Sequence, residues 1–145
     1  MTVHLIKLSV GVEDVEHLAR IQAKRLADAK RKGQKADLKH VTRHAPRRVD
    51  EVLDGGSIYW VIKGFIRARQ RLLDIRPVTR SDGEPACALV LDPRLVTTEL
   101  RGFRPFQGWR YLAPERAPAD GPGPGKTADG VPEAMMAELK GLGLL

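Results

Sequence analysis

The chain has 145 residues, 42% of them hydrophobic and 30% charged, which is typical of one globular domain. No apolar run approaches the roughly 18 residues of a membrane-spanning helix, and residues 1–14 lack the features of a signal peptide. We therefore expect a cytoplasmic protein with no membrane partner.

The net charge of +7 is concentrated in the part of the chain that is predicted to fold. Residues 1–58 hold 12 Lys/Arg against 8 Asp/Glu, and residues 59–112 hold 10 against 5. Residues 113–145 reverse the balance, with 3 against 5. A basic folded region favours polyanionic partners such as nucleic acid.

The first two predicted elements are a strand and a helix. Residues 3–10 (VHLIKLSV) are apolar and β-branched and precede Gly11, which indicates a strand buried on both faces. Residues 12–33 then place their apolar side chains on one helical stripe. Acidic residues at its start and the sequence KRKG at its end suit the helix dipole, and Gly33 can supply a left-handed cap.

Three short elements follow in the middle of the chain. Residues 38–45 (LKHVTRHA) and residues 57–63 (SIYWVIK) are typical of strands. Between them, residues 46–56 (PRRVDEVLDGG) predict a short helix that begins near a proline and ends at two glycines.

Residues 65–78 (FIRARQRLLDIRPV) fit either a helix or a strand, because their apolar residues match both periods. The neighbouring residues favour the strand. Asp82 and Gly83 form a hairpin signal that is followed by the strand-like run ACALVLD, and a hairpin needs a strand on each side. We therefore predict a strand over residues 71–79 and extend it back to residue 65.

The last part of the chain changes in character. Residues 92–102 (DPRLVTTELRG) lead into residues 103–112 (FRPFQGWRYL), which predict an ordered loop that ends in an edge strand. Residues 113–132 contain five prolines and four glycines, which predicts a disordered linker. Residues 133–145 (EAMMAELKGLGLL) predict a short helix that docks on the body, meets a partner or frays.

No recognisable catalytic or metal-binding pattern is present in the sequence. His40 and His44 are four residues apart, but they lie in a predicted strand with no Cys or carboxylate at a ligand spacing. Cys87 lies in an apolar run and is expected to be a buried thiol. We expect no metal, no cofactor and no catalytic residue.

The basic and aromatic residues are better organised. All seven aromatic residues lie between residues 59 and 111, and RGFRPFQGWRY alternates arginines with rings. Rings stack on unpaired bases while arginines bind phosphate, a combination typical of single-stranded or looped RNA. The alternative is that the rings form the core, and Trp60 is expected to pack inward because it shares a strand face with Ile58 and Ile62.

Three arginines, Arg67, Arg69 and Arg71, form what we call the arginine row. If residues 65–73 are extended, their side chains project from one face about 6.5–7 Å apart. Like charges in line repel one another, so either a polyanion or acids on a neighbouring strand must screen them. In a helix the three side chains would spread around the axis.

Two regions carry a resemblance to known families. They are HVTRHAPRRVDEVLDGGSIYWVIKGFIRARQRLLDI, and ALVLDPRLVTTE together with RPFQGWRYL. Over about residues 3–112 the chain resembles an uncharacterised alphaproteobacterial family, domain of unknown function 1489, which implies no activity or site residues. The order of the elements is also similar to that of PUA and ASCH-like domains, small β-barrels with accessory helices that often bind RNA. A fold alone does not establish a function.

Together these patterns predict an α+β domain over residues 1–112, with a mostly antiparallel, PUA-like β-sheet or small barrel and accessory helices. We expect it to bind nucleic acid, RNA over DNA, without catalysis. The expected contacts are Arg43, Arg47, Arg48, Tyr59, Lys63, Arg67, Arg69, Arg71, Arg104, Phe106, Trp109 and Arg110.

Two other functions stay open. One is a protein-interaction module that uses the basic face and residues 133–145. The other is an enzyme that acts on a small anionic substrate near His40, Arg43 and His44.

Overall fold

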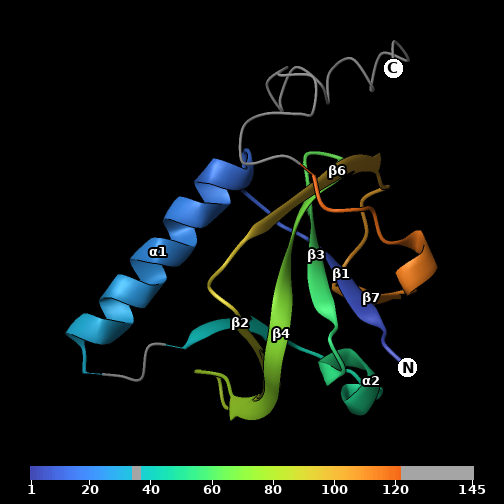
Figure 1. Ribbon diagram of the computed structural model, residues 1–145. Helices are drawn as coiled ribbons and strands as arrows, with labels where there is room; N and C mark the ends of the chain where they lie inside the picture. Colours follow the sequence, from blue (N-terminus) through green and yellow to red (C-terminus); the bar gives the residue numbers. More distant parts are fainter. Residues whose placement is uncertain (34–36, 122–145) are drawn as a thin grey trace.

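The structure, a computed structural model, describes residues 1–33 and 37–121 (Figure 1). Its elements are β1 (His4–Leu8), α1 (Val15–Arg31), β2 (Leu38–Thr42), α2 (Val49–Leu53), β3 (Ser57–Ile62), β4 (Phe65–Thr79), β5 (Pro85–Leu91), β6 (Val96–Gly102), β7 (Trp109–Leu112) and a 3₁₀ turn (Pro114–Arg116). Figure 1 shows α1 along one side of the strands and α2 beside the start of β3.

The strands of the described chain form one sheet in the order β2-β5-β4-β3-β1-β7, and β6 pairs with β4. All pairs are antiparallel except β1 with β3. The predicted α+β class with a mostly antiparallel sheet is confirmed. The sheet is open, with β2 and β7 at its two ends, and the predicted edge strand is β7.

Helix α1 forms where the sequence predicts it. The Asp14 side chain caps its first turn by accepting a hydrogen bond from the His17 backbone N–H at 2.8 Å. Gly33 has a φ of +71°, the left-handed conformation that follows many helices. The helix buries Val15, Leu18 and Gln22.

Strand β3 is buried along its whole length, because both of its faces are covered. We call inner face the side whose buried residues form the larger core cluster with α1, including Leu5, Ile58 and Trp60. We call outer face the opposite side, with a smaller cluster that includes Tyr59 and Val61. Trp60 is 2% exposed, so the predicted inward packing is confirmed.

Residues 65–79 are extended throughout β4, which confirms the strand interpretation. The β3–β4 turn consists of Lys63 and Gly64, both with positive φ (49° and 83°), as a two-residue hairpin turn requires. The predicted hairpin at Asp82 and Gly83 is also confirmed, and it joins β4 to β5.

Strand β6 lies within residues 92–102, to which the sequence analysis assigned no element. It pairs with the first part of β4, while β5 pairs with the later part of β4. A long strand thus accepts two partners in succession along one edge. The short run VTTELRG has no strong alternation of its own, so its extended form depends on that pairing.

The beginning of the expected linker lies against β6. Residues Pro114–Arg116 form the 3₁₀ turn, and Asp120 forms an isolated β-bridge with Thr98. The rest of the expected linker and the expected helix over residues 133–145 lie outside the described residues.

Candidate anion-binding cavity and basic loop

The predicted contact residues of the outer face are only partly available to a ligand. Tyr59 is 5% exposed, and burial raises the pKa of its hydroxyl. Phe106 packs against the outer cluster, with the Arg110 guanidinium 4.9 Å from its ring centroid. Of these three, Arg110 alone is exposed, and Tyr59 has no free face for a base.

The prediction that the whole arginine row lies on one exposed face is wrong, because a β-bulge removes Arg67 from it. Between β3 and β4 the pairing shifts from Trp60 with Ala68 to Val61 with Ile66, so Arg67 is the extra residue. Its side chain is buried, 4% exposed, and its Nε donates a hydrogen bond to the Ile62 carbonyl at 2.7 Å.

Arg69 is tied to the segment that follows the 3₁₀ turn. Its guanidinium donates two hydrogen bonds to the Asp120 carboxylate, at 2.7 and 2.8 Å, and a third to the Ser57 hydroxyl at 3.2 Å. These hydrogen bonds, and next the opposite charges, raise the pKa of Arg69 and lower that of Asp120. In the same row, Arg71 is exposed and has no partner within the described chain.

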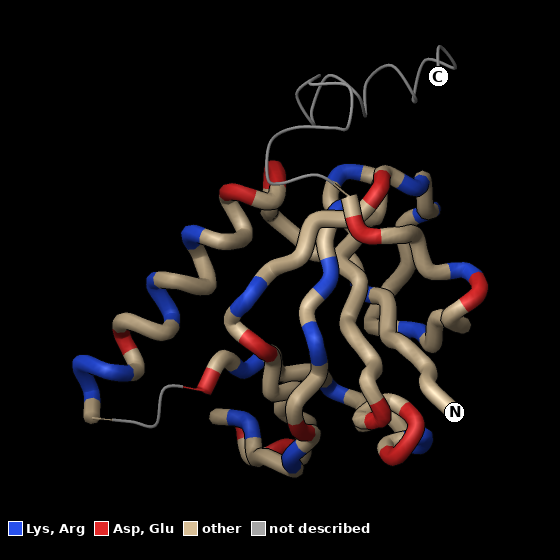
Figure 2. Tube along the Cα trace, in the orientation of Figure 1, with Lys and Arg blue, Asp and Glu red and all other residues tan. Residues whose placement is uncertain are grey.

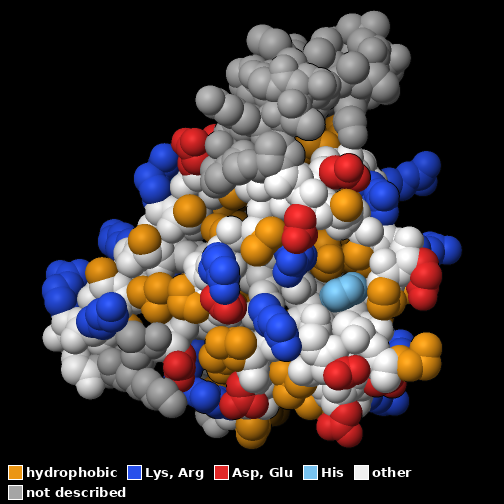
Figure 3. Space-filling model, in the orientation of Figure 1, with side chains coloured by type: hydrophobic (Ala, Val, Ile, Leu, Met, Phe, Trp, Pro, Cys, Tyr) orange, Lys and Arg blue, Asp and Glu red, His pale blue; other side chains and the backbone are white. Residues whose placement is uncertain are grey.

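Figure 2 shows basic residues distributed along α1 and the middle of β4, and Figure 3 shows several of the basic side chains over the central strands next to acidic ones. Another of these predicted contacts, Lys63, forms an ion pair with Glu13. Arg104 is exposed in the loop between β6 and β7. Local ion pairs therefore neutralise part of the basic charge that the sequence assigned to a ligand.

Residues 43–48, which we call the basic loop, are fixed on β7. The Trp109 indole N–H donates to the His44 carbonyl at 2.7 Å. The Tyr111 hydroxyl accepts the backbone N–H groups of Arg47 and Arg48, at 2.9 and 3.1 Å. The rings of Trp109 and Tyr111 pack edge to face with centroids 4.9 Å apart, so the two anchors support each other.

The side chains of the basic loop differ in how far they are engaged. Arg48 forms an ion pair with Glu51, and its guanidinium lies 5.3 Å from the Tyr111 ring centroid. Arg43 and Arg47 are exposed, and among the described residues neither side chain has an acidic hydrogen-bond partner. Two guanidinium groups are thus free to contact a ligand beside the half-buried Trp109.

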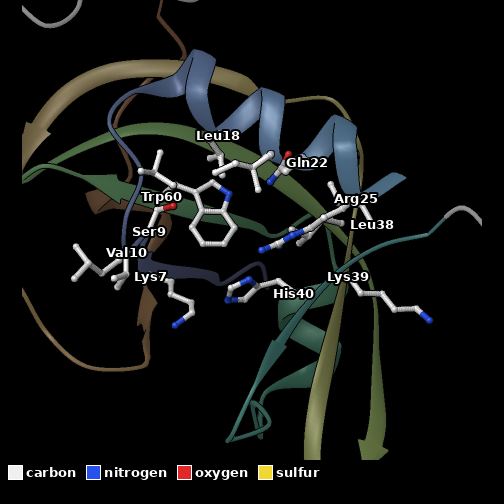
Figure 4. A pocket seen from close by; sticks show the side chains of 14 residues that line it. Lys7, Ser9, Val10, Leu18, Gln22, Arg25, Leu38, Lys39, His40 and Trp60 are labelled. Atoms are coloured by element: carbon white, nitrogen blue, oxygen red, sulfur yellow. The ribbon is translucent and has the colours of Figure 1, made fainter. Parts of the chain in front are cut away.

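A cavity of about 220 Å³ opens where α1 and β2 approach the inner face (Figure 4). We call it the α1–β2 cavity. It is lined by Lys7, Leu8, Ser9, Val10, Val12, Leu18, Ile21, Gln22, Arg25, Leu38, Lys39, His40, Trp60 and Leu91. Figure 4 shows the His40 imidazole between the side chains of Lys7 and Arg25, while Lys39 points away.

All charged side chains that line the α1–β2 cavity are positive. Its lining includes basic residues but no Asp or Glu, and Lys7 and Arg25 have no acidic partner in the part of the chain that the structure describes. His40 Nε2 is buried and has no hydrogen-bond partner there either. Burial and the charges of Lys7 and Arg25 lower the pKa of His40 to about 4, so its imidazole is neutral at pH 7.

A hydrogen-bond network behind the cavity holds Trp60 in place. The Gln70 side-chain oxygen accepts from Trp60 Nε1 at 2.9 Å and from Gln22 Nε2 at 2.8 Å. Its amide nitrogen donates to Gln22 Oε1 at 2.8 Å and to the Asp92 carbonyl at 3.0 Å. Every hydrogen-bonding position of Gln70 is used, and the fixed indole meets the His40 ring edge to face at 5.1 Å.

His40, Arg43 and His44, which the sequence grouped around a small substrate, lie in two different hollows. His40 lines the α1–β2 cavity, whereas Arg43 and His44 border an open depression with Arg80, Asp82, Glu84 and Pro85. The interaction module that would use residues 133–145 depends on a segment outside the described residues.

Comparison with known proteins identifies the family. The model of the family described as "Protein of unknown function (DUF1489)" matches residues 5–145. The chain belongs to this family. No curated protein and no solved structure matches it significantly.

The DUF1489 match covers both the basic loop and the α1–β2 cavity. Two cavity residues of this family member, Lys7 and Arg25, were absent from the predicted contacts, although the sequence carries a signal for each. Lys7 interrupts a strand that is otherwise apolar. Arg25 is exposed, but it follows Leu18 and Gln22 by seven and three residues and so lies on the same side of α1. Neither helix of the described chain has the length and apolar character needed to cross a membrane.

Proposed function

We propose that the chain binds nucleic acid, RNA over DNA, through the basic loop and the adjoining Trp109. The observation that carries the proposal is the attachment of this loop to β7 by Trp109 and Tyr111. Because hydrogen bonds already hold the backbone, little further ordering is needed for Arg43 and Arg47 to contact phosphates. A ring beside paired phosphate contacts provides a stacking surface for an unpaired base.

The surroundings of the loop support the same proposal. Lys7 is the cross-strand neighbour of Trp109, so positive charge continues from the loop towards the α1–β2 cavity. The net charge of +7 favours association with any polyanion. A PUA-like curvature of the sheet and a cytoplasmic location belong to this proposal, since both would place the loop where RNA is accessible.

Salt dependence and a paired substitution test the proposal. Fluorescence anisotropy would follow the binding of the full chain to a mixed single-stranded RNA between about 50 and 300 mM salt. Arg43→Gln together with Arg47→Gln should weaken binding about 10-fold and lower the slope of log K against log salt by about 1.4, or 0.7 per lost phosphate contact.

The matched control is Arg20→Gln together with Lys24→Gln, which removes the same charge from the exposed side of α1. This control should change the affinity less than 3-fold. Equal losses in the two double variants, or binding that does not depend on salt, would contradict the proposal. Duplex DNA of the same length, used as a competitor, should bind more weakly than the RNA.

A further inference from the structure

The α1–β2 cavity gathers hydrogen-bond donors from three elements, and its lining contains no carboxylate among the described residues. Lys7 comes from β1, Arg25 from α1 and His40 from β2. In the described chain, two of them are cations without an acidic partner, and the third has a buried ring nitrogen without a hydrogen bond. Buried polar groups are normally satisfied, so an unsatisfied group between two cations points to an acceptor that binds there.

The remaining lining limits the shape of that acceptor. Apolar side chains of α1 and β2, together with Leu91, form the other walls, and the Trp60 ring is held from behind by Gln70. A volume of about 220 Å³ has room for a tetrahedral anion and part of the group that carries it. Leu18, Leu38, Trp60 and Leu91 of the lining are buried and close the inner end of the cavity. A group at the end of a molecule reaches this inner end more easily than an internal unit of a polymer.

We propose that the α1–β2 cavity binds a terminal phosphate monoester, with Lys7, Arg25 and His40 as donors to its oxygens. A phosphate monoester has a second pKa near 6 and therefore carries nearly two negative charges at pH 7, which match the two unpaired cations. Its several acceptor oxygens match donors that arrive from different elements. A carboxylate has one charge and two oxygens and satisfies fewer of these donors.

Two sources can supply this group, a free mononucleotide or the phosphorylated end of an RNA strand. The site does not rest on the proposed function, because Lys7, Arg25 and His40 lie outside the basic loop and are not changed in the test of that function. A chain that fails to bind unphosphorylated RNA can still bind the phosphate, and the converse also holds. The two proposals therefore fail independently.

Calorimetry and NMR on the full chain test the site with inorganic phosphate, adenosine 5′-monophosphate and acetate as probes. Both phosphates should bind at least 10-fold more tightly than acetate. Arg25→Gln should weaken phosphate binding 10-fold or more, the amount expected for one charge-assisted hydrogen bond. Lys24→Gln, the matched control one residue earlier on α1 and outside the cavity lining, should stay within 2-fold of the wild type.

The NMR signals of the His40 ring protons report directly on phosphate inside the cavity, and phosphate bound elsewhere on the surface would not change them. At the pH where His40 titrates, phosphate carries one negative charge, which still opposes the charges of Lys7 and Arg25. Saturating phosphate should therefore move the midpoint of the His40 titration upward by about half a pH unit.

Matched oligonucleotides distinguish the two sources. If a 5′-phosphorylated RNA binds 10-fold more tightly than the same RNA with a 5′-hydroxyl, and Arg25→Gln abolishes the difference, the ligand is a strand end. If adenosine 5′-monophosphate binds but the two RNAs do not differ, the ligand is a free nucleotide. Equal effects of Arg25→Gln and Lys24→Gln, or an unchanged His40 titration, would overturn the proposal.

Discussion

Strand β4 and the α1–β2 cavity both carry several polar and positively charged side chains. Several of those on β4 have hydrogen-bond partners within the fold, whereas the basic side chains of the cavity have no acidic partner within the described residues. On β4, Arg67 donates to the Ile62 carbonyl, Arg69 pairs with Asp120, and Gln70 uses all of its hydrogen-bonding positions. Each of these β4 side chains has a partner within the fold, as buried or half-buried polar groups normally do.

In the α1–β2 cavity, Lys7 and Arg25 have no acidic partner and His40 Nε2 has no hydrogen bond within the described residues. Two cations and a neutral imidazole converge there without an acid in the lining. The difference separates charge that stabilises the fold from charge that is available to a ligand. The number of arginines in a stretch of sequence does not distinguish these two kinds of charge, because β4 has more arginines than the cavity lining.

The largest expected effect comes from disrupting the hydrogen bonds of Gln70 on β4. Gln70→Leu leaves Trp60 Nε1, the Gln22 amide and the Asp92 carbonyl without partners in the core. Each such group costs about 1–3 kcal/mol, so the free energy of unfolding should fall by about 4 kcal/mol in urea denaturation. Arg71→Gln, an exposed change on the same strand, should stay within about 0.5 kcal/mol of the wild type.

A loss below about 1 kcal/mol for Gln70→Leu would show that the polar groups of β4 are not structural. The contrast between β4 and the cavity would then lose its basis. The Trp60 fluorescence of the variant gives a second readout, because an indole that has lost its acceptor changes its environment.

Much of the fold could be predicted from sequence, because helix α1 and the strands around the two hairpins are specified by local period and turn residues. Two features could not be predicted in this way. Strand β6 depends on an edge of β4 far away in sequence, and the bulge at Arg67 arises where β4 pairs with both β3 and β6. A bulge reverses which face each later side chain occupies, so the expected arginine row failed at its first member.

The candidate site was harder to predict than the fold for a related reason. His40 was identified because two histidines stand close together in sequence, yet its neighbours in the cavity are Lys7 and Arg25 rather than Arg43 and His44. Residues of β1, α1 and β2 line one cavity although three strands separate β1 from β2 in the sheet, so only the folded chain brings them together. Sequence periodicity indicates which face of its own helix or strand a residue occupies. It does not indicate which residues of other elements pack against that face.

A smaller effect on stability should appear when acid protonates His40 in the α1–β2 cavity. His40 has a pKa of about 4 in the folded chain against an ordinary value of 6.5, because of burial and the facing charges of Lys7 and Arg25. The unfolded chain therefore binds more protons between these pH values. Stability is complete above pH 6.5 and falls as the pH approaches 4, by about 2–3 kcal/mol in total from this group.

Urea denaturation between about pH 7 and pH 4 measures this loss as a difference between variants. His40→Gln should lose about 2 kcal/mol less than the wild type over that range, whereas His44→Gln, at an exposed position, should follow the wild type. Burial and, to a smaller extent, the charge of Arg69 also lower the pKa of His4. The His40→Gln variant should therefore still lose some stability as the pH falls. Identical pH profiles for the His40 and His44 variants would show that the cavity histidine is not held neutral.

The smallest effect is expected where a satisfied pair lies near solvent. Asp120→Ala removes both carboxylate acceptors of Arg69, but the Arg69 and Asp120 side chains are 26% and 50% exposed, so water replaces part of what is lost. Unfolding should become easier by at most about 1 kcal/mol, and less at high salt. A double-mutant cycle with Arg69→Ala measures the pair itself. A coupling near zero would move Arg69 into the group of available cations, beside Arg71, and would make the outer face a second place where a polyanion can bind.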